Sequence, residues 1–92
     1  MNHFEAAPSS PRIKALMDIE KTATEGSYEL VMLEETEENL RFQILSSEQE
    51  GLGQDESEAF LQSLFAHSTV LSEENTRIVV HPNYAVNIEV SL

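Results

Sequence analysis

The sequence predicts an α+β fold: two helices and a four-stranded antiparallel sheet in the order α-β-β-α-β-β, with both helices on one face of the sheet. Two segments, 11–25 and 55–67, carry apolar residues at helical spacing. Four shorter segments alternate apolar and polar residues, and they come in two pairs that short polar turns can join into hairpins. The length of 92 residues fits one domain. We assign that domain to 11–92 and expect 1–10, which has little pattern, to be a flexible tail.

The first helix is predicted over 11–25. Ser10 followed by Pro11 is typical of a helix start, and Gly26 is a favourable residue for the helix stop. The apolar stripe of this helix consists of Ile13, Leu16, Met17, Ile19 and Ala23.

Strands are predicted over 28–34 and 40–46, joined by the polar turn 35–39 into a hairpin with an acidic tip. A loop with two glycines, 46–54, leads to the second helix. There Asp55 and Glu58 match the D-x-x-E form of a capping arrangement.

The second hairpin is predicted from strands over 77–81 and 84–92, which turn at Pro82 and Asn83. The alternation along 84–92 is the cleanest in the chain. The residues expected to face the helices are Tyr28, Leu30, Met32, Leu40, Phe42, Ile44, Tyr84, Val86, Ile88 and Val90.

The opposite sheet face is predicted to carry apolar residues as well. They are Val31, Leu33, Leu45 and Val79. A sheet face open to water is usually polar, so this set indicates a face for a second copy or a client segment. A twisted edge strand, or the 46–54 loop folding over these residues, would account for them equally well, and both interpretations remain open.

Charge is the main anomaly of the composition: 17 Asp and Glu stand against 5 Lys and Arg, a net charge of −12. Direct binding to nucleic acid or to an anionic membrane needs the opposite sign. A strongly acidic surface either keeps a small protein in solution or complements a basic protein partner, and we expect such a partner. The absence of cysteine, of a secretion signal and of a long apolar run leads us to expect a cytoplasmic protein.

Most of the acidic residues lie between 25 and 58, where Arg41 is the sole base. The hairpin tip, the following loop and the start of the second helix are predicted to form one negative ridge that imitates the phosphates of DNA. Turns and helix starts favour acids for local reasons too. The candidate partner-binding residues of this ridge are Glu34, Glu35, Glu37, Glu38, Glu48, Glu50, Asp55 and Glu56.

No catalytic or cofactor motif is present, so we expect a non-catalytic protein without metal or cofactor. His3, His67 and His81 lack the spacing of a metal-binding pair. The carboxylates fall mainly in turns and helix starts, where water surrounds them, and not in the apolar pocket that an acid–base pair needs. Gly51 and Gly53 lack the context of a phosphate-binding loop.

The favoured interpretation is an inhibitor that occupies the basic surface of a nucleic-acid-handling protein, as small phage-encoded anti-defence proteins do. An immunity protein or antitoxin against a basic nuclease is a close variant. The alternative is an acidic dimeric chaperone or adaptor, because the order helix, hairpin, helix, hairpin resembles the type III secretion chaperones. That resemblance covers only the order of elements; the chain is shorter than that family and has no third C-terminal helix or matching sequence motif.

Overall fold

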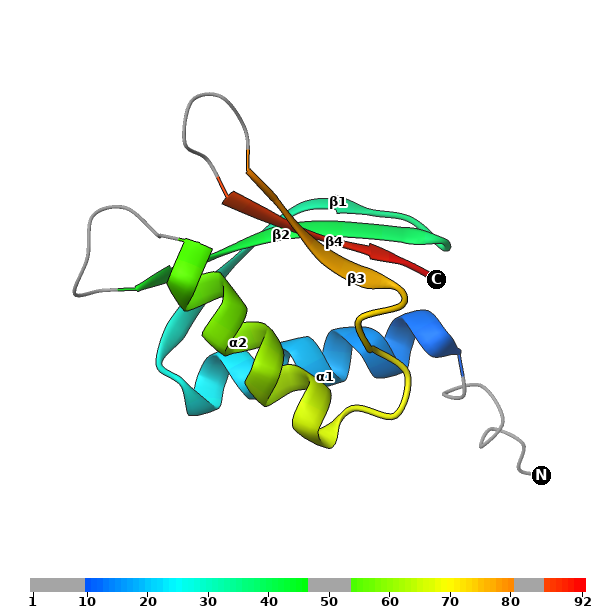
Figure 1. Ribbon diagram of the computed structural model, residues 1–92. Coiled ribbons are helices and arrows are strands. Elements are labelled where there is room, and N and C mark those ends of the chain that lie inside the picture. The colour runs from blue at the N-terminus through cyan, green and yellow to red at the C-terminus, as the bar shows by residue number, and fades with distance from the viewer. Residues whose placement is uncertain (1–9, 47–53, 81–85) are drawn as a thin grey trace.

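The computed structural model describes residues 10–46, 54–80 and 86–92 of the chain. It confirms the predicted fold class and order of elements (Figure 1). The helices and strands are α1 (Pro11–Glu25), β1 (Tyr28–Glu35), β2 (Asn39–Ser46), α2 (Gln54–His67), β3 (Thr76–Val80) and β4 (Val86–Ser91). The predicted tail, apart from Ser10, and the predicted turn at Pro82 and Asn83 lie outside the described residues.

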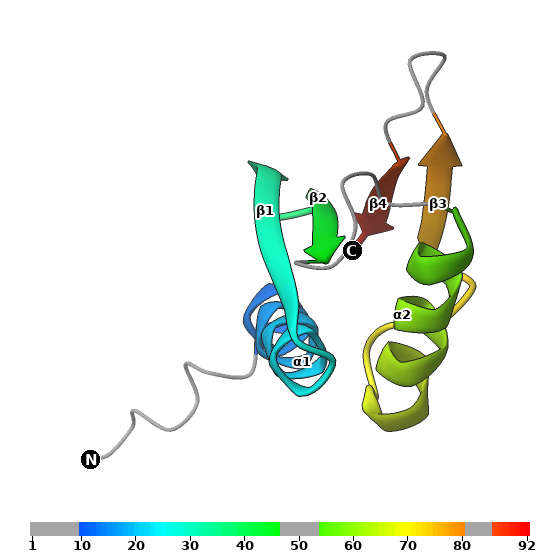
Figure 2. The ribbon, with the colours of Figure 1, turned by 90° about the vertical axis from the view of Figure 1, so that its left-hand side faces the viewer.

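The four strands form one antiparallel sheet in the order β1-β2-β4-β3. The strand that comes last in the chain therefore lies inside the sheet and joins the two hairpins. Both helices cover the same face, α1 under β1 and α2 under β3 and β4 (Figures 1 and 2). The other face, which we call the outer face, carries no helix (Figure 2).

The core fills the space between the sheet and the two helices. Strands β2 and β4 are buried on this side, as the alternation predicted, whereas the predicted position of Tyr84 lies outside the described residues. The ring of Phe60 on α2 meets the rings of Tyr28 and Phe42 edge to face, at centroid distances of 5.8 and 6.1 Å. The large apolar side chains that are fully enclosed are Ile19, Leu40, Phe42, Ile44, Phe60, Leu64, Ile88 and Val90.

The end of α1 differs from the prediction in its details. Gly26 has a φ of −92°, whereas Ser27 takes the left-handed conformation with a φ of 61°. A Cβ atom at position 26 would lie 2.7 Å from the ring of Tyr28. Gly26 is therefore needed for the close approach of an aromatic ring, and the left-handed residue that ends the helix is a serine.

A β-bulge near the end of β1 changes which side chains face the helices. Met32 pairs with Phe42, but the next paired residue is Glu34, opposite Arg41, so Leu33 is the extra residue. Simple alternation would place Glu34 on the helix side. The bulge instead turns Glu34 to the outer face and brings Glu35 to the helix side.

The start of α1 is as predicted, with Ser10 as the N-cap residue and Pro11 as the first helical residue, whereas the start of α2 differs from the prediction. Ser10 precedes α1 but makes no capping hydrogen bond with its side chain. Asp55 lies within the first turn of α2, which begins at Gln54, so the predicted D-x-x-E arrangement does not form. The carboxylate of Glu58 instead accepts a hydrogen bond of 3.3 Å from the amide of Gln54, one turn earlier.

Candidate functional site

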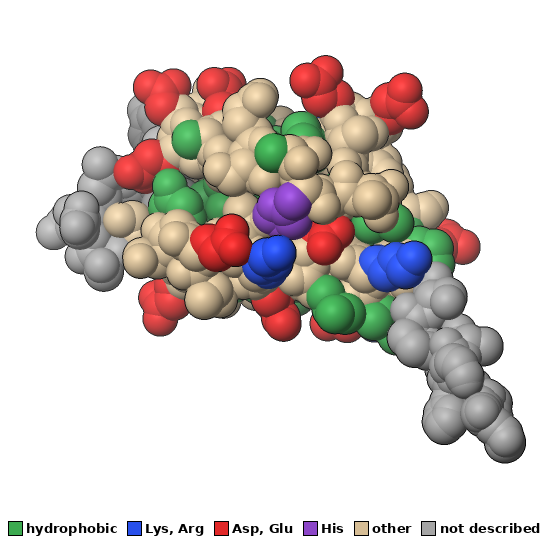
Figure 3. All heavy atoms as spheres, turned by 90° about the horizontal axis from the view of Figure 1, so that it is seen from below, with side chains coloured by type: hydrophobic (Ala, Val, Ile, Leu, Met, Phe, Trp, Pro, Cys, Tyr) green, Lys and Arg blue, Asp and Glu red, His purple; other side chains and the backbone are tan. Residues whose placement is uncertain are grey.

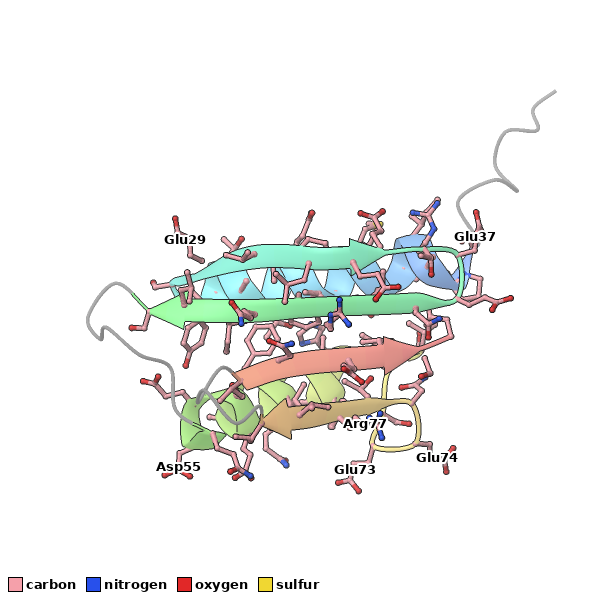
Figure 4. All side chains as sticks on the ribbon, turned by 90° about the horizontal axis from the view of Figure 1, so that it is seen from above. Glu29, Glu37, Asp55, Glu73, Glu74 and Arg77 are labelled. Carbon is pink, nitrogen blue, oxygen red and sulfur yellow. The ribbon has the colours of Figure 1, made fainter. Side chains whose placement is uncertain are left out.

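The predicted acidic residues lie at opposite ends of the sheet. Glu37 and Glu38 occupy the turn between β1 and β2, whereas Asp55 and Glu56 open α2, beyond the far end of β2 (Figure 4). The 8 residues of β2 separate these groups by about 25 Å at roughly 3.3 Å per residue. The structure therefore does not bring the two groups into one ridge. Glu48 and Glu50 lie outside the described residues.

The turn between β1 and β2 lies at the same end of the sheet as the turn that precedes β3, with the end of β4 between them. Because β4 pairs with both β2 and β3, its last residues touch both turns: Leu92 N donates to Glu38 O (2.6 Å) and Ser91 N donates to Asn75 O (2.8 Å). Glu73 and Glu74 thus lie at the same end of the sheet as Glu37 (Figure 4). We call Glu37, Glu38, Glu73 and Glu74 the acidic end.

Sequence reasoning missed this grouping because Glu73 and Glu74 are more than 30 residues from the first turn in the chain. Only the strand order brings the two turns together. The clean alternation before position 92 marks a half-buried strand but does not say which strands flank it.

Side-chain hydrogen bonds fix the shape of both turns. In the first, the hydroxyl oxygen of Thr36 accepts from the backbone N–H groups of Glu38 (3.3 Å) and Asn39 (2.9 Å). In the second, the side chain of Asn75 accepts from Ser72 N (3.0 Å) and donates to Val70 O (2.8 Å). The carboxylates of the acidic end are therefore carried on ordered backbone.

Most of the basic side chains form salt bridges with acidic side chains of the same chain. Arg12 binds Glu35 at 2.8 Å and reaches Glu37 at 4.0 Å, on the side of the sheet to which the bulge turns Glu35. Two further pairs join Arg41 to Glu34 (3.5 Å) and Arg77 to Glu89 (3.2 Å) on the outer face. Within residues 10–46, 54–80 and 86–92, no salt bridge involves Glu38, Glu73 or Glu74. The acidic end therefore keeps most of its negative charge.

The outer face holds the four apolar residues that the sequence singled out, but not as one patch. Val31 and Leu33 on β1 are 36% and 43% exposed, and half-buried Leu45 lies on β2 opposite Glu29. Val79 is on β3, at the opposite edge of the sheet. Between the two edges lie Gln43 and Asn87, which share a hydrogen bond of 2.8 Å. The middle of this face is polar.

The helical side of the molecule shows a single polar link between its two helices, as far as the described residues go. Thr22 Oγ1 donates to Asp18 O (2.8 Å) and lies 3.0 Å from His67 Nε2. Because the hydroxyl proton is used on Asp18, the histidine nitrogen is the donor in the second contact. His67, drawn in purple in Figure 3, thus ties α2 to α1.

Two kinds of site find no support in the part of the chain that the structure describes. No group of three or more His, Cys, Asp or Glu side chains there could hold a metal ion. The hollow on the outer face, of about 160 Å³, is lined by Glu34, Arg41 and Glu89 among others. It is smaller than the roughly 300–1,000 Å³ of typical ligand pockets. A second hollow, of about 460 Å³ beside Met17, Glu20 and Lys21, reaches that range but is a shallow open surface on α1 and not an enclosed pocket.

No protein-family model, no curated protein and no solved structure gives a significant match to this chain. None of the described helices is both long enough and apolar enough to pass through a bilayer.

Proposed function

We propose that this chain is a non-catalytic binding protein that inhibits a nucleic-acid-handling protein by occupying its basic surface. The binding surface is the acidic end, and not the ridge first expected from the sequence. One observation carries this proposal: Glu37, Glu38, Glu73 and Glu74 lie at the same end of the sheet on two ordered turns, and salt bridges leave most of their charge uncompensated.

The chemistry of such a surface suits a groove that otherwise holds DNA or RNA. Arginine and lysine side chains that neutralise phosphates also form charge-assisted hydrogen bonds to carboxylates. A net charge of −12 on 92 residues attracts a basic partner over the screening length of about 8–10 Å. Association is therefore fast, and the inhibitor competes directly with nucleic acid for the same cationic side chains.

An immunity protein or antitoxin against a basic nuclease would use the same surface in the same way. The two functions differ only in whether the partner is foreign or is made by the same cell.

The test compares two charge-reversal variants that have equal net charge. The first is E37K/E38K/E73K/E74K; the control, E20K/E29K/D55K/E58K, reverses four exposed acids elsewhere. Each replaces four negative by four positive charges, so each changes the net charge from −12 to −4. Tagged wild-type and variant proteins are used to capture partners from cell lysate at about 0.15 M and 0.5 M salt, and the captured proteins are identified by mass spectrometry.

The expected result is a basic nucleic-acid-binding protein that the wild type and the control retain at the lower salt, and that the acidic-end variant loses. Purified, that protein should leave the wild-type chain when duplex DNA or RNA is added. Equal retention by both variants, or a complex that nucleic acid does not displace, would contradict the proposal.

A further inference from the structure

The outer face has a charge pattern that is complementary to itself. The strand register places one residue from each strand in a row across the sheet, in the order Glu34, Arg41, Glu89 and Arg77. The signs therefore alternate from β1 to β3: negative, positive, negative, positive. Salt bridges of 3.5 and 3.2 Å join the outer pairs of this row.

The neighbouring row on the same face is also symmetrical in character. It begins with Val31 on β1 and ends with Val79 on β3, and the hydrogen-bonded amides of Gln43 and Asn87 lie between them. The order of side-chain types is the same from β1 to β3 as from β3 to β1: apolar, amide, amide, apolar.

From these two rows we infer that the outer face binds a second copy of this chain about a two-fold axis parallel to the strands. That operation lays β1 of one copy on β3 of its partner and β2 on β4, as in aligned packing of two sheets. Glu34 then meets the partner's Arg77, and Arg41 meets the partner's Glu89. Val31 meets the partner's Val79. Each of these contacts occurs twice, as a symmetrical interface requires.

Balanced charge along this row favours the outer face for the approach of two copies, although exposed Glu29 on β1 adds one acid to the same face. Each chain carries a net charge of −12, so most orientations of two copies are repulsive. The row across the outer face contains two acids and two bases and is neutral. The side chains of Glu34 and Arg41 are each 42% exposed, that of Arg77 is 75% exposed and that of Glu89 is 27% exposed, whereas Asn87 in the neighbouring row is buried.

Size limits the strength of this association. Four strands at about 4.8 Å spacing and five to six residues at about 3.3 Å give a footprint near 20 by 20 Å. That area is well below the roughly 800 Å² per partner of a standard stable interface. The same two-fold axis brings both acidic ends to one end of the dimer, where they repel. We therefore expect a dissociation constant on the order of 100 μM at about 0.15 M salt.

Charge reversal at the two ends of the row provides the test. Glu34→Arg and Arg77→Glu are each examined alone and as an equimolar mixture, by sedimentation equilibrium from about 10 μM to 1 mM and by native mass spectrometry. Glu20→Arg and Lys14→Glu on α1 form the matched control pair, with the same charge changes away from the outer face. Circular dichroism and thermal melting verify that every variant is folded.

The wild type is expected to dimerise, and each outer-face variant to dimerise roughly tenfold more weakly, because each reversal makes two symmetry-related contacts repulsive. The mixture should restore association as a heterodimer, since the arginine introduced by Glu34→Arg meets the glutamate introduced by Arg77→Glu. The control pair should behave as the wild type apart from a small effect of net charge. Three outcomes would overturn the inference: a wild type that stays monomeric at 1 mM, a dimer that neither reversal weakens, or a mixture no better than its components.

Discussion

Replacement of Phe60 by alanine is expected to remove between about a third and nearly all of the stability of this domain. The side chain is 1% exposed and contacts both the edge strand β1, through Tyr28, and the inner strand β2, through Phe42. Phe→Ala substitutions in cores cost about 3–5 kcal/mol, and the two edge-to-face ring contacts place this one toward the upper value. A domain of 92 residues has about 5–14 kcal/mol in total, at roughly 0.05–0.15 per residue.

The assay is urea unfolding at 25 °C, followed by circular dichroism, with free energies from linear extrapolation. Phe65→Ala is the matched control, because Phe65 is on the same helix but only half-buried, and it should lose about 1–2 kcal/mol. Phe60→Leu keeps most of the apolar volume and should lose less than Phe60→Ala. If Phe60→Ala cost no more than Phe65→Ala, the three-ring cluster would not be the centre of the core.

Three further substitutions probe the turns. Ser27→Gly should raise the unfolding free energy by about 0.5–1 kcal/mol, because glycine relieves the left-handed φ of 61° at some cost in unfolded-state entropy; a loss of stability in thermal melts would refute this. Gly26→Ala should lower the unfolding free energy by about 1–3 kcal/mol, because the new Cβ would lie 2.7 Å from the ring of Tyr28. No change in urea unfolding would show that the ring moves freely. Thr36→Ala should lower the unfolding free energy by about 1 kcal/mol and broaden the amide resonances of Glu38 and Asn39. Thr36→Ser keeps the hydroxyl and should do neither. Equal effects of the two substitutions would show that the hydroxyl does not stabilise the turn.

Much of the fold could be predicted because each element has its own periodic pattern. The helix over 11–25 has the predicted bounds, and the other predicted bounds that fall on described residues are met within one residue. The predicted end of the third strand at His81 and the predicted start of the fourth at Tyr84 lie outside the described residues. The buried side of β2 and β4 followed from strict alternation. Alternation failed at Glu34 and Glu35, because a bulge depends on how a strand pairs with its neighbour and leaves no trace in the strand's own pattern.

The candidate surfaces could be predicted only in part, because acidic residues that are close in the sequence were expected to be close in space. Asp55 follows the hairpin closely in sequence, yet an extended strand carries the chain to the far end of the sheet before α2 begins. Glu73 is distant in sequence and near in space, since β4 pairs between β2 and β3. Strand order is a property of the whole chain, so neither fact could be read from a local window.

The central position of β4 also has a consequence for how the chain folds. Each hairpin pairs residues close in sequence and can form within microseconds. The pairing of β2 with β4 joins residues as far apart as Asn39 and Ser91, and it carries the entropy cost of closing the long segment between them. We therefore expect this contact to limit the folding rate, as long-range pairing does in other sheet proteins. Until it forms, the inner edges of both hairpins stay open to pairing with other chains.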